Sequence, residues 1–423
     1  MSDYQHEDAG YAATTEPGKP RRKAWKIGLI VALCAVVGAG GIGAVAVVPW
    51  AQAKVDAVPD GGTGSSAAVA AKPVELGVSP VDGAVQVNPV APAAVKAVNG
   101  KLKAVSLVDN KTGAAAAGSL SADGTSWTAA GPLAFDTSYT YTLTVLDGAN
   151  RESTKTQTFS TVPAANEADA TSYVRDGGNV GAGQPVELTF SEPVLNKAAV
   201  ENAIKITSSS GQVGAFRWFG DKIVRYRPEN FWTAKSVVTV DLKLLGVDFG
   251  NGMIGNFNKT ITMNVGDKKV LVADAANHVS NLYVNDVLVR TMPVTMGDTR
   301  FPSAAGFLVM MEKEKEAVFK ADSIGLQPGD PAYYGTLNVS NAIRITTGGE
   351  YVHQALPAAY GNVGNSNVSH GCVGLLPDDA NWVFDNMTTG DLVQVINSER
   401  GPTEADDGFG DWNIPWAQYA SRG

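Results

Sequence analysis

A mainly β protein with several domains is the fold class that this sequence predicts, and three observations indicate it. The 423 residues exceed what one hydrophobic core usually organises, so several domains are expected. Short runs rich in β-branched and aromatic residues recur between turn signals along most of the chain. Apolar residues make up 44% and charged residues 18% of the chain, a balance that favours packed cores over disorder.

The N-terminal part predicts a membrane anchor. Residues 27–49 include an uncharged run, Ile27 to Val48, long enough as a helix to cross a hydrocarbon core of about 30 Å. Basic residues precede this run, so the positive-inside rule makes 1–26 a cytoplasmic tail and places the remainder outside the cytoplasm. The length favours an uncleaved anchor, although the small-x-small pattern at residues 51–53 leaves cleavage as a removed signal open.

Two β-sandwich domains are expected after a flexible linker. Residues 50–72 are rich in Ala, Gly and Ser and bury too little apolar surface to order themselves. Residues 73–164 and 165–266 then show short strand-like runs with turn signals between them, a spacing typical of immunoglobulin-like sandwiches. The net charge of −9 is carried by the part beyond the basic N-terminal residues, which excludes nucleic acid as an expected partner.

A third, β-rich domain is expected at 267–398, with a C-terminal tail at 399–423 packed on the preceding domains. Strands are predicted from runs such as Lys269–Val272 and Leu392–Ile396. One helix is also predicted, because Pro377 suits a first helical position and two aspartates after it favour the positive end of the helix dipole. Gly390 suits a stop soon afterwards.

One thiol in the exported part is the strongest chemical signal. Cys34 falls in the membrane run and is interpreted as a buried membrane cysteine, so Cys372 can form no intramolecular disulfide. The chain has only four histidines, and His353 and His370 lie within 19 residues of Cys372. A free thiol is mostly protonated near neutral pH, so a nucleophilic cysteine needs a base beside it. The run Ser369-His370-Gly371-Cys372 therefore indicates a cysteine nucleophile.

His353 is the better base of the two histidines. It closes a predicted strand that would hold its ring rigidly, whereas His370 is two residues from the thiol, and such residues often point apart in a tight turn. Backbone N–H groups of Gly371 and Cys372 are candidates for stabilising an oxyanion. Other interpretations are an inert thiol, an intermolecular bridge, or a zinc site that lacks an evident further ligand. A papain-like enzyme would place its cysteine before its histidine, and a sortase would separate them further.

The residues around the thiol resemble a known family. His353, fifteen intervening residues and Ser369-His370-Gly371-Cys372 are similar to the signature of L,D-transpeptidases of the YkuD type, which remodel peptidoglycan. The resemblance extends to Phe301-Pro302 with Gly306, to Gly390–Val395 and to the tail Gly410–Trp416. With the anchor and the immunoglobulin-like modules, it covers nearly the whole chain as a multidomain envelope form of the family.

The resemblance implies a thioester mechanism and names the residues that perform it. Cys372 is expected to attack the carbonyl of the third residue of a tetrapeptide stem and to expel D-Ala, and an amine of a neighbouring stem then forms a 3→3 cross-link. His353 corresponds to the base, the main-chain carbonyl of Gln354 to the third element of the triad, and His370 to a further catalytic residue. Gly371 and Cys372 correspond to the oxyanion hole.

The resemblance also implies a substrate pocket under a lid. The stretch from Phe319 to Tyr334 matches the lid loop of the family, with Tyr334 near the oxyanion. Phe319, Tyr334, Ser369 and Asn367 are the expected substrate contacts. Gly374 departs from the family pattern, because the position two after the cysteine usually carries Asn, Arg or Ser.

The expected function is peptidoglycan cross-linking by a cysteine acyltransferase at the outer face of the cell membrane, facing the cell wall. No metal or organic cofactor is implied, and carbapenem β-lactams are expected covalent inhibitors. Two alternatives stay open: an L,D-carboxypeptidase that hydrolyses the same thioester, and a non-catalytic wall-binding or scaffold protein with an inert thiol. The immunoglobulin-like modules are interpreted as spacers, with wall binding as the weaker possibility.

Overall fold

The computed structural model describes residues 72–421, and the mainly β class predicted from the sequence is confirmed. Strands dominate this part of the chain, with helices only at α1 (Lys197–Asn202), α2 (Pro377–Asn386) and α3 (Trp416–Ala420) and in short 3-10 turns. None of the helices in the range 72–421 is long and apolar enough to span a membrane. The predicted cytoplasmic tail, membrane span and linker, up to residue 71, lie outside the described residues.

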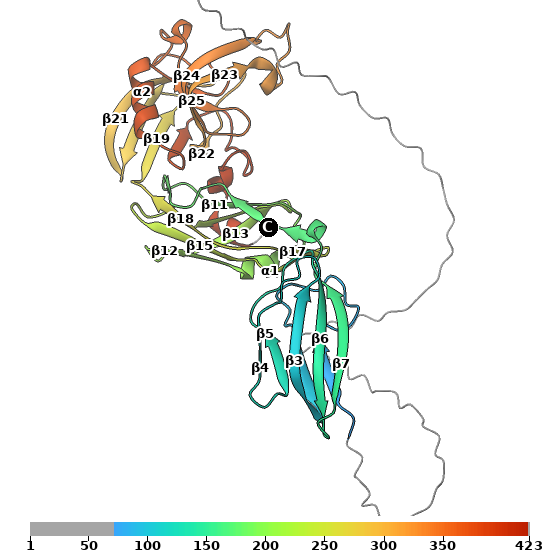
Figure 1. Ribbon diagram of the computed structural model, residues 1–423. Helices are drawn as coiled ribbons and strands as arrows, with labels where there is room; N and C mark the ends of the chain where they lie inside the picture. The colour runs from blue at the N-terminus through green and yellow to red at the C-terminus, as the bar shows by residue number, and fades with distance from the viewer. Residues whose placement is uncertain (1–71, 422–423) are drawn as a thin grey trace, which may run out of the picture. The chain divides into compact units, whose positions relative to one another are not determined.

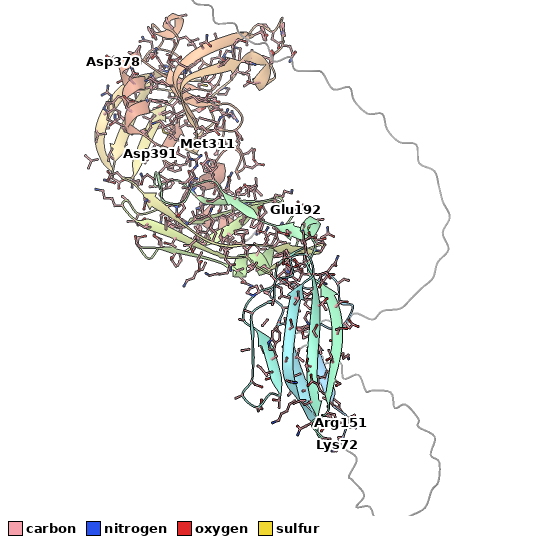
Figure 2. The ribbon with its side chains drawn as sticks, viewed as in Figure 1. Lys72, Arg151, Glu192, Met311, Asp378 and Asp391 are labelled. Atoms are coloured by element: carbon pink, nitrogen blue, oxygen red, sulfur yellow. The ribbon has the colours of Figure 1, made fainter. Side chains whose placement is uncertain are left out.

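Two sheets share the first apolar core of the described chain (Figure 1). One sheet has the order β1-β2-β5-β4, with bounds β1 Glu75–Ser79, β2 Ala94–Val98, β5 Ser126–Ala129 and β4 Gly118–Leu120. The other has the order β3-β6-β7, with bounds β3 Gly100–Asp109, β6 Ser138–Asp147 and β7 Glu152–Ser160. Alternate residues of β6 are buried, as expected for a strand with one face on a core. Lys72 and Arg151 mark the same end of these sheets (Figure 2).

A second core lies between two four-stranded sheets. The first has the order β10-β18-β15-β12, with bounds β10 Gly178–Val180, β18 Asn258–Val265, β15 Val237–Lys243 and β12 Ile204–Ser208. The second has the order β13-β14-β11-β9, with bounds β13 Gly214–Phe219, β14 Ile223–Pro228, β11 Val186–Phe190 and β9 Ala170–Ser172. A small sheet, β16-β17-β8, completes this region with bounds β16 Asp248–Gly250, β17 Met253–Gly255 and β8 Glu167–Ala168.

A nine-stranded sheet carries the C-terminal third of the chain (Figure 1). Its order is β22-β27-β19-β20-β21-β26-β25-β24-β23. The bounds are β22 Gly306–Val309, β27 Leu392–Ile396, β19 Lys269–Asp274, β20 Val279–Val284, β21 Val287–Thr295, β26 Val373–Leu375, β25 Tyr351–Gln354, β24 Thr336–Arg344 and β23 Lys313–Lys320. The β19–β27 and β25–β26 pairs are parallel and the other neighbours are antiparallel.

Helix α2 covers the sheet beside β24, β25 and β26. It begins at Pro377 as predicted, with Asp378 in its first turn (Figure 2), and Ala380 and Val383 are buried against the core. Lys313 of β23 caps the C-terminus of the helix. Its ammonium donates to the carbonyl oxygen of Phe384 and, at 2.7 Å, to that of Met387. A cation at a helix C-terminus complements the helix dipole. The helix is thereby fixed to the strands that carry the cavity described below.

The C-terminal tail contacts residues of the second sandwich. Arg227 of β14 donates to the Asp411 carbonyl oxygen at 3.0 Å, and its guanidinium lies 4.0 Å from the centre of the Tyr419 ring. Arg225 donates to the Asp411 carboxylate at 3.3 Å. Burial raises the pKa of Asp411, and both arginines oppose that rise. This buried charge cluster holds the tail residues that follow the nine-stranded sheet.

Candidate active site

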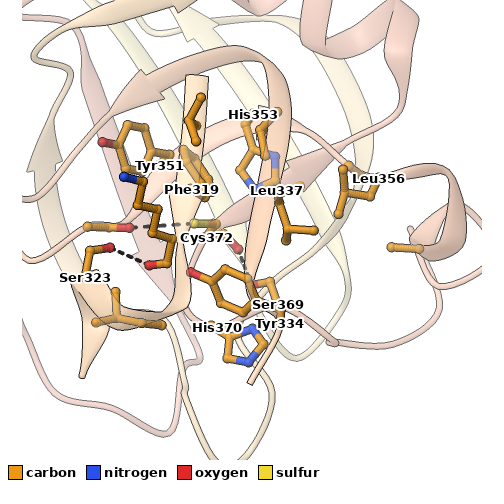
Figure 3. A pocket seen from close by; sticks show the side chains of 18 of the residues that line it. Phe319, Ser323, Tyr334, Leu337, Tyr351, His353, Leu356, Ser369, His370 and Cys372 are labelled. Atoms are coloured by element: carbon orange, nitrogen blue, oxygen red, sulfur yellow. Dashed lines mark hydrogen bonds between the residues drawn. The ribbon is translucent and has the colours of Figure 1, made fainter. Parts of the chain in front are cut away.

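A cavity of about 420 Å³ opens over the nine-stranded sheet. Its lining comes from β23, β24, β25, β26, the end of β21, the segment 321–335 that joins β23 to β24, and the loops 347–349, 355–359 and 368–372. Six predicted site residues are in this lining: Phe319, Tyr334, His353, Ser369, His370 and Cys372 (Figure 3). The remaining predicted residues, Gln354, Asn367 and Gly371, are not among the described residues that line the cavity. Gln354 and Gly371 form hydrogen bonds with the lining residues His353 and Ser369.

The parallel pairing of β25 with β26 brings the histidine and the cysteine to one face of the sheet. His353 pairs with Gly374, so Cys372, two residues earlier, comes opposite Tyr351. Side chains two residues apart on a strand share a face. All four of these residues line the cavity, and Figure 3 shows Cys372 below Tyr351 and His353. A Cβ at Gly374 would lie 2.9 Å from Thr295 Cγ2, so this wall of the cavity leaves no room for a side chain there.

His353 is buried and held in one tautomer. Its Nδ1 lies 2.7 Å from the carbonyl oxygen of Gln354. A carbonyl oxygen only accepts hydrogen bonds, so Nδ1 carries the proton and Nε2 keeps its lone pair. Burial lowers the pKa of His353, with the hydrogen bond to Gln354 opposing that change. Phe319 packs edge-on against the ring, with 5.4 Å between ring centres. The result is a rigid, neutral imidazole that can accept a proton at Nε2.

The Cys372 thiol is buried at the end of the turn that leads into β26. Burial raises the pKa of Cys372 to about 12, the nearby Glu350 carboxyl raises it further, and a hydrogen bond from the Tyr351 backbone N–H lowers it. The sulfur lies 3.9 Å from the Gly349 carbonyl oxygen. The resting site therefore holds a neutral thiol and a neutral imidazole. Such a thiol reacts as a nucleophile only when a base takes its proton.

Ser369 closes the turn that carries the thiol. Its hydroxyl donates to the Cys372 carbonyl oxygen at 2.7 Å and accepts from the Gly371 N–H at 3.2 Å. The Ser369 N–H donates to the Met296 carbonyl oxygen at 3.0 Å, which ties the turn to the end of β21. Gly371 has φ +116°, a conformation that residues with a side chain rarely adopt. The oxyanion role of the Gly371 and Cys372 N–H groups stays a prediction.

His370 connects the turn to the segment that forms one wall of the cavity. Its Nε2 lies 3.1 Å from the Ala332 carbonyl oxygen. Its ring lies between Phe301 and Tyr334, with ring centres 4.8 and 5.0 Å away. Burial raises the pKa of Tyr334, and Cys372 adds to the rise. His370 thus contacts the 321–335 segment, whereas His353 lies on the same face of the sheet as Cys372.

Asn367 holds backbone in place. Its side-chain oxygen accepts from the Met296 N–H at 2.9 Å, its amide nitrogen donates to the Ala275 carbonyl oxygen at 2.8 Å, and His278 Nδ1 lies 3.1 Å from that side-chain oxygen. These bonds join the loop before the Ser369–Cys372 turn to the ends of β19 and β21. The predicted substrate contact at Asn367 stays a prediction, and the structure adds a scaffolding task.

The sequence of this chain is similar to protein families and individual proteins that are already known. Residues 268–395 match a family model described as the L,D-transpeptidase catalytic domain, and residues 84–248 match one described as a bacterial Ig domain. L,D-transpeptidase 2 of Mycobacterium tuberculosis is 37% identical over 345 residues, which cover 82% of this chain and 84% of the relative. The chain belongs to the L,D-transpeptidase family. Its catalytic domain is of the acyltransferase type.

Two further proteins are similar to this chain. L,D-transpeptidase 5 of Mycobacterium tuberculosis is 30% identical over 349 residues, which cover 81% of this chain and 75% of the relative. A solved structure of the LD transpeptidase LdtMt1 in complex with imipenem is 32% identical and covers 53% of this chain and 97% of that chain, with a TM-score of 0.48.

Sequence reasoning missed several residues of this L,D-transpeptidase site. Lys320, Leu337 and Arg344 line the cavity from β23 and β24. β23 is the highly charged run Lys313–Lys320, which has no simple apolar alternation and was not predicted as a strand; its last two residues were expected as the beginning of a lid loop. Glu350 and Arg400 meet beneath the nucleophile turn, 50 residues apart in the chain. No local pattern signals a pair at that separation. Among residues 72–421, no group of three or more His, Cys, Asp or Glu side chains is arranged to hold a metal ion.

Proposed function

We propose that this L,D-transpeptidase forms 3→3 cross-links in peptidoglycan through a thioester on Cys372. The hydrogen bond between His353 Nδ1 and the Gln354 carbonyl carries this proposal, because it leaves Nε2 as a base in the cavity that holds the only thiol of the described chain. The shared face of β25 and β26 supports the pairing of base and nucleophile. A high thiol pKa and a low histidine pKa fit a thiol that loses its proton only as it attacks.

Acylation is the first half of the reaction. Cys372 Sγ attacks the carbonyl carbon of the third residue of a tetrapeptide stem while its proton passes to His353 Nε2. The resulting oxyanion is stabilised by backbone N–H groups of the nucleophile turn. The C–N bond to the terminal D-Ala then breaks, and the proton on Nε2 passes to the leaving amine. The product is a thioester on Cys372 and free D-Ala.

Transfer is the second half. The side-chain amine of the third residue of a neighbouring stem attacks the thioester, and His353 Nε2 takes the proton that the amine loses. The C–S bond breaks, and the proton returns to the sulfur, which restores the thiol. Water attacking the same thioester would instead give a tripeptide, the product of an L,D-carboxypeptidase. A cavity lined by Phe319, Tyr334 and His353 favours transfer by limiting water around the thioester.

We also propose how the protein is placed. The N-terminal residues anchor it in the cell membrane with the catalytic part facing the wall, and the two immunoglobulin-like modules act as spacers. Supporting the placement are the basic residues before the apolar run Ile27 to Val48. A reporter fusion after residue 72 would test it in cells: an external reporter that becomes cytoplasmic when the basic residues are replaced fits the anchor, and an internal reporter in the native protein contradicts it.

The reaction is tested with a disaccharide-tetrapeptide and mass analysis. Loss of D-Ala together with a cross-linked dimer is the expected result, and loss of D-Ala with tripeptide alone would show hydrolysis in place of transfer. Cys372→Ala is the matched control and should give neither product while keeping the circular dichroism of the native protein. No D-Ala release by the folded native protein would refute catalysis and favour a wall-binding role.

Carbapenems provide a second test of the nucleophile. A β-lactam carbonyl is a strained acyl donor, so ring opening by Cys372 leaves a stable thioester on the protein. Intact-mass analysis should show one adduct on the native protein, located at Cys372 by peptide mapping. An adduct of the same mass on the Cys372→Ala variant would contradict the assignment.

A further inference from the structure

A buried carboxylate lies directly behind the turn that carries Cys372. Glu350 is 6% exposed and precedes β25. Its two carboxylate oxygens accept from the Ala304 N–H at 3.1 and 3.3 Å. A Cβ added to Gly371 would lie 3.2 Å from both Cγ and Cδ of Glu350. The carboxylate side chain is therefore the surface against which the positive-φ turn rests.

Arg400 is the cation that meets this carboxylate. Its Nη1 donates to Glu350 Oε1 at 2.6 Å, although the Arg400 side chain is 45% exposed. The backbone around Arg400 is held in turn: the Arg400 N–H donates to Ser398 Oγ at 3.3 Å, and that hydroxyl donates to the Ser303 carbonyl oxygen at 2.5 Å. The guanidinium thus reaches the turn from a fixed segment that follows β27.

The charges around Glu350 act on the thiol. Burial raises the pKa of Glu350 to about 7; the Ala304 N–H and Arg400 lower it, and Asp407 raises it. Of these two charged groups, Arg400 favours the anion and Asp407 opposes it. Burial is the largest cause of the raised pKa of Cys372, and the Glu350 anion raises that pKa further. The hydrogen bond from the Tyr351 N–H lowers the pKa of Cys372. The negative charge of Glu350 opposes formation of the Cys372 thiolate, and the positive charge of Arg400, which pairs with Glu350, offsets this effect.

We propose that Arg400 is a positioning residue of the active site: it holds the Glu350 carboxylate against Gly371 and offsets the negative charge that this carboxylate places behind Cys372. The inference rests on the proposed function, in which Cys372 is the nucleophile. Arg400 is not among the residues that line the cavity, and its guanidinium bonds Glu350, so it acts on the thiol through Glu350.

The test measures alkylation of Cys372 by iodoacetamide at about pH 6 and about pH 9, read at the Cys372 peptide by mass so that Cys34 does not interfere. In Arg400→Met the uncompensated carboxylate should slow alkylation about tenfold near pH 9, the effect of one unit of thiol pKa. Near pH 6, where Glu350 holds a proton, the two rates should agree within about twofold. Glu350→Gln should be faster than the native protein near pH 9, because the opposing charge is gone.

The double variant Glu350→Gln with Arg400→Met separates positioning from simple damage. If Arg400 acts through Glu350, the double variant should alkylate as fast as Glu350→Gln within about twofold. Slowing that persists in the double variant, or that is equal at both pH values, would overturn the proposal. So would an Arg400→Met variant that reacts at the native rate near pH 9.

Two controls keep the result interpretable. Arg300→Met makes the same change at an exposed arginine that pairs with Asp298, and it should leave alkylation unchanged. Arg400→Lys keeps the charge and should retain the native alkylation rate within about threefold. If Arg400→Met does not fold, Arg400→Lys and Glu350→Gln together test the proposal. Alkylation uses no peptidoglycan. An unexpected pH pattern with intact D-Ala release therefore refutes the positioning role alone, whereas absent D-Ala release refutes the proposed function.

Discussion

Replacing Ser369 with alanine should loosen the nucleophile turn by a predictable amount. The hydroxyl makes two hydrogen bonds across the turn, to the Cys372 carbonyl oxygen at 2.7 Å and from the Gly371 N–H at 3.2 Å. At about 0.5–1.5 kcal/mol each, their loss should lower the free energy of unfolding by about 1–3 kcal/mol. Both bonds hold the backbone that aims the thiol, so carbapenem acylation should slow about tenfold or more, which corresponds to about 1.4 kcal/mol in the barrier.

Chemical denaturation and intact-mass acylation kinetics measure the two effects. Ser340→Ala is the matched control: its exposed hydroxyl donates to the Glu316 carboxylate at 3.0 Å on the adjoining edge strand. This change should alter stability by less than about 0.5 kcal/mol and leave acylation unchanged. Ser369→Thr, which keeps a hydroxyl, should recover part of both losses. If Ser369→Ala matches the Ser340→Ala control in stability and in acylation rate, the turn does not depend on this hydroxyl and the reasoning is refuted.

Three further outcomes are expected. His353→Gln should slow carbapenem acylation at least about 100-fold. Because burial lowers the pKa of His353, the acylation rate of the native protein should stay constant until the pH falls below about 6.5. A decline in the native rate that begins above that pH would contradict a neutral buried base. Lys313→Met removes the ammonium that ends helix α2 and should lower the free energy of unfolding by about 1–2 kcal/mol in denaturant titrations; an unchanged midpoint would count against the capping role. Burial raises the pKa of Asp391 to about 7, so the folded chain keeps a proton that the unfolded chain releases between about pH 4 and pH 7, and stability falls as pH rises through that window. Asp391→Asn should therefore raise the melting temperature near pH 8 and not near pH 4, and equal shifts at both would exclude a charge effect.

The element types that the sequence predicted correctly are those with strong local signals. The predicted strand Lys269–Val272 lies within β19 and Leu392–Ile396 coincides with β27, because both runs are dense in β-branched and large apolar residues. Helix α2 begins at Pro377 as its sequence signals predict. β23 was not predicted as a strand, since four charged side chains in its first half obscure any alternation. An edge strand is free to carry such charges because one of its sides has no strand to pair with.

Cys372, His353 and the Gln354 carbonyl were all site candidates from the sequence, the carbonyl only through the resemblance to the family. Cysteine and histidine are rare in this chain, and Cys372 and His353 lie close together in sequence, which makes these two visible without coordinates. Direct hydrogen bonding of His353 to Gln354 joins neighbours in sequence and so follows from local chain geometry. By contrast, Gly374 looked like a departure from the family pattern, and only the packing of Thr295 against it explains why no side chain fits.

Short segments of the sequence therefore indicate which reactive residues the site contains. The surroundings of those residues depend on segments that are far apart in the sequence. The thiol of Cys372, the two histidines near it in sequence and the many strand-like runs can be read from the order of residues. The parallel register of β25 with β26, the burial that raises the pKa of Cys372, and the meeting of Glu350 with Arg400 arise only when the nine-stranded sheet forms. Propensity acts over a few neighbouring residues, whereas burial and charge interactions depend on which surfaces the folded chain brings together.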